Sequence, residues 1–121
     1  MSHRILIVDD EPNIVISLEY LMKKEGFEVA VATDGDAALL QAAAFAPDLI
    51  LLDVMMPKKS GFEVCQALRA DPAQAAVKII MLTAKGRETE VTKGMALGVD
   101  AYITKPFSNK DLVLQIKSLL A

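Results

Sequence analysis

The sequence has very few of the residues on which common catalytic and metal sites depend. It contains one cysteine, Cys65, which excludes a disulfide framework and a multi-thiolate metal site. Its one histidine, His3, lies at the N-terminus, so we do not expect Ser-His-Asp or Cys-His catalysis. No apolar run approaches the roughly 18 residues that a membrane-spanning helix requires.

Neither acidic nor basic residues are in large excess. The net charge is −3, and the absence of a basic cluster argues against direct nucleic-acid binding by this chain. The first residues lack the basic and then apolar pattern of a signal peptide, so we expect a cytoplasmic protein that does not associate with membranes. The 121 residues, 53% of them hydrophobic, predict a single folded domain over residues 1–121.

Short apolar stretches alternate with helical patterns along the chain. The strands are predicted at residues 5–8, 27–31, 49–52, 77–82 and 101–103, with helices between them around residues 14–22, 37–44, 62–68 and 88–97, and a last helix after Ser108. This alternation predicts a parallel sheet with helices on both faces. The first and third strands are the most apolar and belong at the centre, which predicts the order 2-1-3-4-5 of a doubly wound, flavodoxin-like α/β fold.

The predicted strands end in residues that can carry chemistry. Ligands of such sheets bind at the carboxyl ends of the strands, near the point where the strand order reverses. Asp9 and Asp10 follow the first strand, Asp53 follows the third, Thr83 follows the fourth and Lys105 follows the fifth. The strand order therefore predicts that three carboxylates, a hydroxyl and an ammonium group meet at one edge of the sheet.

Such a group of carboxylates needs a cation or protons. Two carboxylates 4 Å apart repel each other by about 4 kcal/mol at an effective dielectric constant near 20. Carboxylate oxygens favour Mg²⁺, Mn²⁺ or Ca²⁺ over zinc. An aspartate beside such an ion, a lysine and a hydroxyl group can act as a nucleophile toward a phosphoryl group. Lys105 and the metal would neutralise the transferring oxygens, and Thr83 would donate a hydrogen bond to one of them.

These motifs resemble those of the receiver domain of two-component response regulators. The similarity covers essentially the whole chain, and the motifs are specific in this order and spacing. The matching segments are residues 5–11 (ILIVDDE), 51–57 (LLDVMMP), 60–61 (SG), 81–84 (MLTA) and 102–107 (YITKPF).

The resemblance implies a role for each acidic residue at the predicted edge. Asp53 corresponds to the phosphoacceptor, and Asp10 to a direct ligand of Mg²⁺, for which Mn²⁺ is an alternative. The main-chain carbonyl of Met55 corresponds to a further ligand. Asp9 corresponds to a companion acid that acts partly through metal-bound water.

The resemblance also implies a conformational switch. Thr83 corresponds to the switch hydroxyl, Lys105 to the cation that pairs with the phosphoryl group, and Tyr102 to an aromatic residue that swings inward when Thr83 moves. In the family, the bond matching Lys105–Pro106 is typically cis. Such a domain is a phosphoacceptor rather than an enzyme, although it assists its own phosphotransfer and autodephosphorylation.

The partners implied are a histidine kinase or phosphotransfer protein, and an output target or attached effector domain. The family uses the face formed by the fourth helix, the fifth strand and the fifth helix for output, and a homodimer is an alternative there. Asp100 is followed by Ala101, where many DNA-binding relatives have paired acids, so their particular ion-paired dimer is not implied. Packing alone predicts that Met95 and Leu114 on these helices are buried.

Three other functions remain open at this stage. A hydrolase with an aspartyl nucleophile would need room for its substrate and often a cap insertion, which this chain lacks. A flavodoxin-like cofactor carrier would need a phosphate cradle, whereas residues 9–12 (DDEP) are anionic. A receiver-like module that is never phosphorylated has no support, since the whole acceptor set is present.

Overall fold

The computed structural model describes residues 3–56, 58–84 and 95–121. Five parallel strands form one sheet in the order β2-β1-β3-β4-β5, which confirms the predicted topology. The strands are β1 (Arg4–Val8), β2 (Glu28–Ala32), β3 (Leu49–Asp53), β4 (Lys78–Ala84) and β5 (Ala101–Lys105). The described helices are α1 (Pro12–Lys24), α2 (Gly35–Phe45), α3 (Gly61–Ala70) and α5 (Asn109–Leu120). Most of the helix predicted at residues 88–97 lies outside the described residues.

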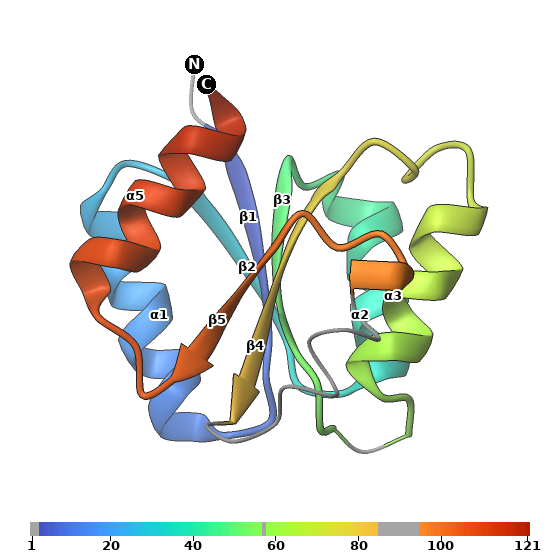
Figure 1. Cartoon of the computed structure of the whole chain (residues 1–121), viewed down its shortest axis with the longest axis horizontal. Helices are drawn as coiled ribbons and strands as arrows, with labels where there is room; N and C mark the ends of the chain where they lie inside the picture. Colours follow the sequence, from blue (N-terminus) through green and yellow to red (C-terminus); the bar gives the residue numbers. More distant parts are fainter. Residues whose placement is uncertain (1–2, 57, 85–94) are drawn as a thin grey trace.

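The helices form two layers, one on each side of the sheet. In Figure 1, α1 and α5 cover one face, and α2 and α3 cover the other. The side chains of β1 and β3 alternate between these layers, as a strand geometry requires. Leu6 and Ile50 pack in the cluster on the α2 and α3 side, and Ile7 and Leu51 pack in the cluster on the α1 and α5 side. Both central strands are therefore buried on both faces, which explains their uninterrupted apolar sequences.

The helix starts follow the sequence signals closely. Asp34, Ser60 and Ser108 are the N-caps of α2, α3 and α5, and each side chain accepts a hydrogen bond from the backbone N–H three residues later. Helix α1 begins after Glu11 without a side-chain cap. Cys65 is fully buried in α3, and burial raises the pKa of its thiol.

The strand boundaries place the functional edge. β4 extends through Thr83 to Ala84, two residues further than its apolar run indicates, because residues 82–84 still pair with β3 or β5. Asp53 pairs with Leu82, and Thr83 pairs with Thr104. All five strands point the same way, so their carboxyl ends meet at the lower edge in Figure 1, opposite both chain termini.

Candidate phosphoacceptor site

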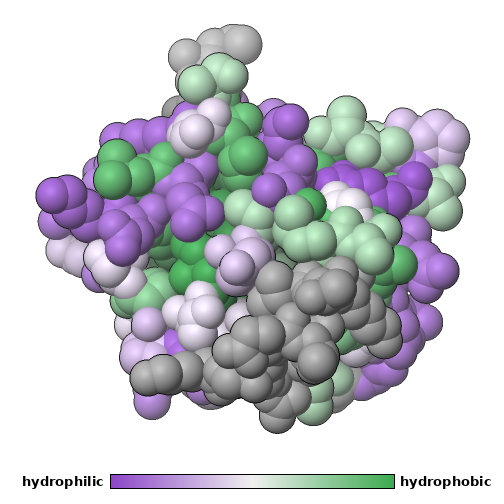
Figure 2. All heavy atoms as spheres, in the orientation of Figure 1, coloured by the Kyte–Doolittle hydropathy of each residue, from purple (hydrophilic) through white to green (hydrophobic). Residues whose placement is uncertain are grey.

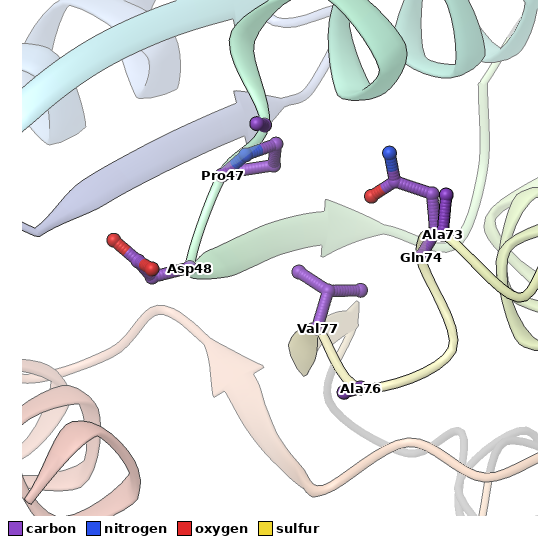
Figure 3. Close-up of a pocket in the computed structure, with 7 residues that line it drawn as sticks. Pro47, Asp48, Ala73, Gln74, Ala76 and Val77 are labelled. Carbon is purple, nitrogen blue, oxygen red and sulfur yellow. The ribbon is translucent and has the colours of Figure 1, made fainter.

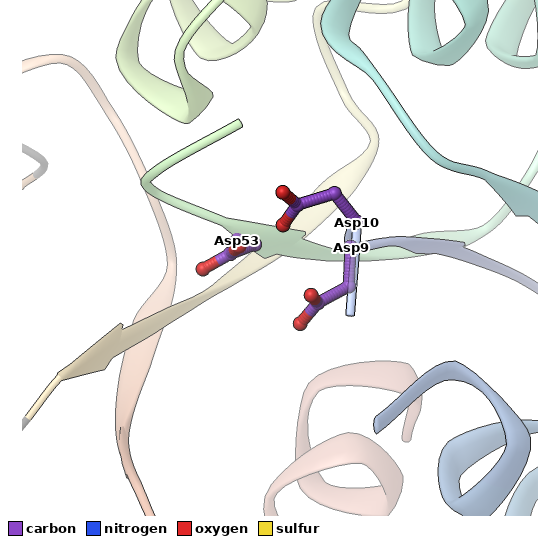
Figure 4. A group of neighbouring side chains, drawn as sticks. All are labelled: Asp9, Asp10 and Asp53. Carbon is purple, nitrogen blue, oxygen red and sulfur yellow. The ribbon is translucent and has the colours of Figure 1, made fainter. Parts of the chain in front are cut away.

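Three aspartates gather where β1 and β3 end. Asp9 directly follows β1, Asp10 is the next residue, and Asp53 is the last residue of β3. Figure 4 shows the three side chains extending to the same side of the strand ends. One carboxylate oxygen from each lies within 4.8 Å of the others. The site is thus located at the point where the strand order reverses, between β1 and β3.

The aspartates differ in their exposure to solvent. Asp9 is fully buried and Asp53 is 7% exposed, whereas Asp10 is exposed. Two buried carboxylates beside a third are costly unless positive charge compensates them. This set of oxygen donors, with one solvent-facing member, therefore suits a hard divalent cation that keeps some of its water.

Lys105 supplies the positive charge that the described residues place at the site. Its ammonium nitrogen lies 2.8 Å from Asp9 Oδ2, 3.2 Å from Glu11 Oε1 and 3.3 Å from Asp53 Oδ1. An ammonium group has three N–H donors, so these contacts occupy all of them. The peptide bond between Lys105 and Pro106 is cis, as the family resemblance implies.

The electrostatics of the site make Asp53 harder to ionise than an ordinary aspartate. Burial, together with the charge of Asp9, raises the pKa of Asp53 to about 6, although Lys105 acts in the opposite direction. Burial acts to lower the pKa of Lys105, but its hydrogen bond to Asp9 and the charges of Asp53 and Asp9 raise it above the ordinary value. Lys105 therefore stays charged, and the ionisation of Asp53 depends on its burial and on its charged neighbours.

The other predicted site residues, Thr83, Tyr102 and Met55, belong to β4, β5 and the segment after β3. Thr83 is 2% exposed and lies on β4, one residue beyond the partner of Asp53 in the sheet. Met55, two residues after Asp53, is 59% exposed. Tyr102 on β5 is 44% exposed.

Two sets of contacts were missed by the sequence argument. Glu11 contacts Lys105, and the only sequence signal for this is a glutamate at a helix start where Ser, Thr, Asp or Asn is preferred. Arg69 of α3 bonds the carbonyls of Ala75, Val77 and Gly98, and also the carboxylate of Asp100. No local pattern predicts this network, because its members come from separate segments.

A hollow of about 250 Å³ lies at the opposite end of the sheet. Figure 3 shows it between the start of β3 and the segment before β4. Its one charged side chain, Asp48, accepts a hydrogen bond from the backbone N–H of Arg4 at 2.8 Å. The lining therefore offers little chemistry, and the acidic edge remains the candidate functional site.

The fold and the site together define a class of protein. It is a flavodoxin-like α/β domain with an acidic, lysine-bridged centre at the point where the strand order reverses. The response regulator receiver domain model matches residues 5–117, and the chain belongs to this family of two-component signalling domains.

Two curated relatives support the assignment. The chain is 45% identical over 120 residues to the alkaline phosphatase synthesis transcriptional regulatory protein PhoP of Bacillus subtilis, covering 99% of this chain and 49% of that protein. It is 43% identical to the DNA-binding response regulator MtrA of Mycolicibacterium smegmatis, covering 99% of this chain and 51% of that protein. The chain thus spans about half the length of these curated relatives.

Two solved structures share the fold over almost their whole length. The chemotaxis response regulator CheY4 of Vibrio cholerae has a TM-score of 0.92 and 30% identity, with 98% of this chain and 99% of that chain covered. The receiver domain of the sensor histidine kinase PA1611 from Pseudomonas aeruginosa has a TM-score of 0.91 and 27% identity, with 99% and 98% covered. That structure has a magnesium ion coordinated in its active site cleft. Among the residues described here, no helix is long and apolar enough to cross a membrane.

Proposed function

We propose that residues 1–121 form one receiver domain that accepts a phosphoryl group on Asp53 and changes conformation in response. The observation that carries this proposal is the convergence of Asp53 with Asp9, Asp10 and Lys105 at the carboxyl edge of the sheet. The phosphodonor is the phosphohistidine of a histidine kinase or phosphotransfer protein. Because these donors act in the cytoplasm, we also expect the domain there.

The reaction requires an ionised Asp53. Its carboxylate oxygen attacks phosphorus and forms the acyl phosphate, while the P–N bond to the donor imidazole breaks and its electron pair stays on that nitrogen. Lys105 already lies 3.3 Å from Asp53, so it can pair with a phosphoryl oxygen after a small movement. The same groups would assist attack by water in autodephosphorylation, so the domain acts on itself and does not turn over a separate substrate.

Asp10, Asp53 and Asp9, with the main-chain carbonyl of Met55, are the groups that would hold Mg²⁺, or Mn²⁺ in its place. The mutual approach of three carboxylate oxygens within 4.8 Å supports this choice. The ion, when bound, would neutralise charge on the transferring phosphoryl group. Burial of Asp9 and Asp53 keeps these oxygens in a fixed position, which reduces the reorganisation needed during transfer.

Thr83 and Tyr102 are the proposed switch residues. Thr83 lies one residue beyond the β4 partner of Asp53, so its hydroxyl is on the element nearest the new phosphoryl group. Its movement would vacate space into which Tyr102 turns. The 44% exposure of Tyr102 is consistent with the outward position before phosphorylation.

The output surface that we propose includes β5 and α5, together with the end of the helix before β5. Met95 and Leu114 were predicted to pack in the interior, but they are 48% and 58% exposed and therefore available to a partner. Figure 2 shows hydrophobic residues lying between hydrophilic ones on the face toward the viewer. The partner is an output target or effector domain, with a homodimer as the alternative. We expect no direct binding of nucleic acid or membrane by this domain.

The test is mass spectrometry of the protein after treatment with acetyl phosphate, with and without Mg²⁺. We expect one phosphoryl group per chain that requires Mg²⁺, and its loss in Asp53→Asn. The matched control is Asp48→Asn, which changes an aspartate directly before the same strand at the opposite edge of the sheet. Stoichiometric acid-labile phosphate on the Asp53→Asn variant would show that the acceptor is another residue.

A further inference from the structure

Helix α1 begins differently from the other described helices. The N-cap side chains of α2, α3 and α5 each accept a backbone hydrogen bond, whereas Glu11 makes no such bond at the start of α1. Replacing a good cap by an uncapped residue usually destabilises a helix. A position that departs from the local preference in this way often serves a function instead.

The Glu11 side chain contacts Lys105 rather than the helix. Its Oε1 lies 3.2 Å from the ammonium nitrogen, and its own backbone N–H donates to Asp9 Oδ1 at 3.0 Å. The side chain of Glu11 is 60% exposed, whereas that of Asp9 is fully buried and that of Asp53 is 9% exposed. Among the partners that the described residues give Lys105, Glu11 is therefore the one that water can replace at little cost.

We propose that Glu11 is a positioning residue that restrains Lys105 in the unphosphorylated domain. All three N–H donors of Lys105 are occupied, so Lys105 can bond a phosphoryl oxygen and also keep its contact with Asp53 only if another contact is released. The exposed contact to Glu11 is the one released. Glu11 thus slows phosphorylation by holding part of the binding capacity of Lys105. This inference rests on the proposed function of Asp53.

Two substitutions separate the contact from the charge. Glu11→Asp keeps the negative charge but shortens the side chain, and aspartate at this position is well suited to cap α1 instead of reaching Lys105. Glu11→Gln removes the charge and keeps the length. The matched control is Glu28→Gln, which removes an exposed carboxylate paired with Arg4 at the far edge of the sheet.

The rate of acyl-phosphate formation from acetyl phosphate at saturating Mg²⁺ is the first measurement. Release of an exposed ion pair should accelerate Glu11→Asp and Glu11→Gln by about two- to five-fold, and Glu28→Gln should match the wild type. The second measurement does not depend on the reaction. Glu11→Asp should raise the Tm because α1 gains a cap, and ¹⁵N NMR should show faster solvent exchange of the Lys105 ammonium protons.

The outcomes distinguish the two proposals. Absence of phosphorylation in the wild type contradicts the function proposed for Asp53. If the wild type is phosphorylated and Glu11→Asp reacts at the same rate or more slowly, the restraint does not exist. If only Glu11→Gln is faster, the charge of Glu11 repels the donor and the contact with Lys105 has no role. Unchanged exchange of the Lys105 ammonium protons in Glu11→Asp also overturns the proposal.

Discussion

The two ends of the same sheet differ in how many carboxylates each basic residue contacts. At the amino end, Arg69 bonds Asp100 and three backbone carbonyls, and Arg4 pairs with Glu28 and also bonds the carbonyl of Phe45. Each of these arginines has several acceptors and one carboxylate partner. At the carboxyl end, Lys105 is shared by the three carboxylates of Asp9, Glu11 and Asp53.

This difference separates a structural use of charge from a functional one. The amino end joins α3 to the segments that precede β4 and β5, and its charges are balanced within the chain. The carboxyl end keeps an excess of negative charge, which leaves room for a cation, and burial together with this charge raises the pKa of Asp53. The predictions below change one end at a time, beginning with the largest expected effect.

Removing the guanidinium group at the amino end should have the greatest effect on stability. Arg69→Met retains most of the side-chain length but leaves Asp100 and three carbonyls without this donor. We expect a loss of about 3 kcal/mol in the free energy of unfolding, measured by urea denaturation. Arg4→Met is the control, because its exposed ion pair with Glu28 should contribute at most about 1 kcal/mol. Equal losses in the two variants would refute the distinction.

Adding a divalent cation should stabilise the carboxyl end. A ligand that binds only the folded state adds about 2.7 kcal/mol when its concentration is 100 times its Kd. We expect Mg²⁺ to stabilise the wild type by up to this free energy. Calorimetry should show a higher Tm with Mg²⁺ than with a chelator. Asp10→Asn should lose most of this response. Asp36→Asn, which changes an exposed residue of α2, should retain it. A full response in Asp10→Asn would exclude Asp10 as a ligand.

The pH dependence of stability should report the burial of Asp53. Its pKa is about 6 in the folded protein against 3.8 for an unperturbed aspartate, so the free energy of unfolding falls as pH rises from 3.8 to about 6 and is constant above that range. Without metal, we expect Asp53→Asn to be about 2 kcal/mol more stable than the wild type at pH 7.5. The difference should disappear below pH 4, where both folded and unfolded carboxyl groups are protonated. A difference that is independent of pH would show that ionisation of Asp53 is not its source.

The smallest effect concerns the backbone. Lys58, in the loop after β3, and Ala46, at the end of α2, have φ values of 69° and 51°. Substitution of either by glycine should remove a left-handed strain of about 1 kcal/mol. Urea denaturation should therefore show a gain in both Lys58→Gly and Ala46→Gly. Only Lys58→Gly should alter the phosphorylation rate, because its loop adjoins Asp53. A change in rate for Ala46→Gly would mean that the two ends are coupled.

Much of the fold followed from local patterns. The apolar runs of β1 and β3 indicated central strands, and Ser108 marked the start of the last helix. The end of β4 was wrong by two residues, since pairing with neighbouring strands extends it through Thr83. The exposure of Leu114 was also missed, because helical spacing shows which side chains are near one another but not what covers them.

The sequence by itself determined the alternation of strands and helices, and with it the chain positions at which acidic and basic residues follow a strand. These are local properties, because they depend on hydrophobic periodicity and on neighbouring residues. Only the tertiary structure decided that Glu11 joins Asp9 and Asp53 as a partner of Lys105, and that Arg69 reaches Asp100. The physical reason is that these contacts join residues far apart in the chain, whose burial and distances depend on how the helices pack against the sheet.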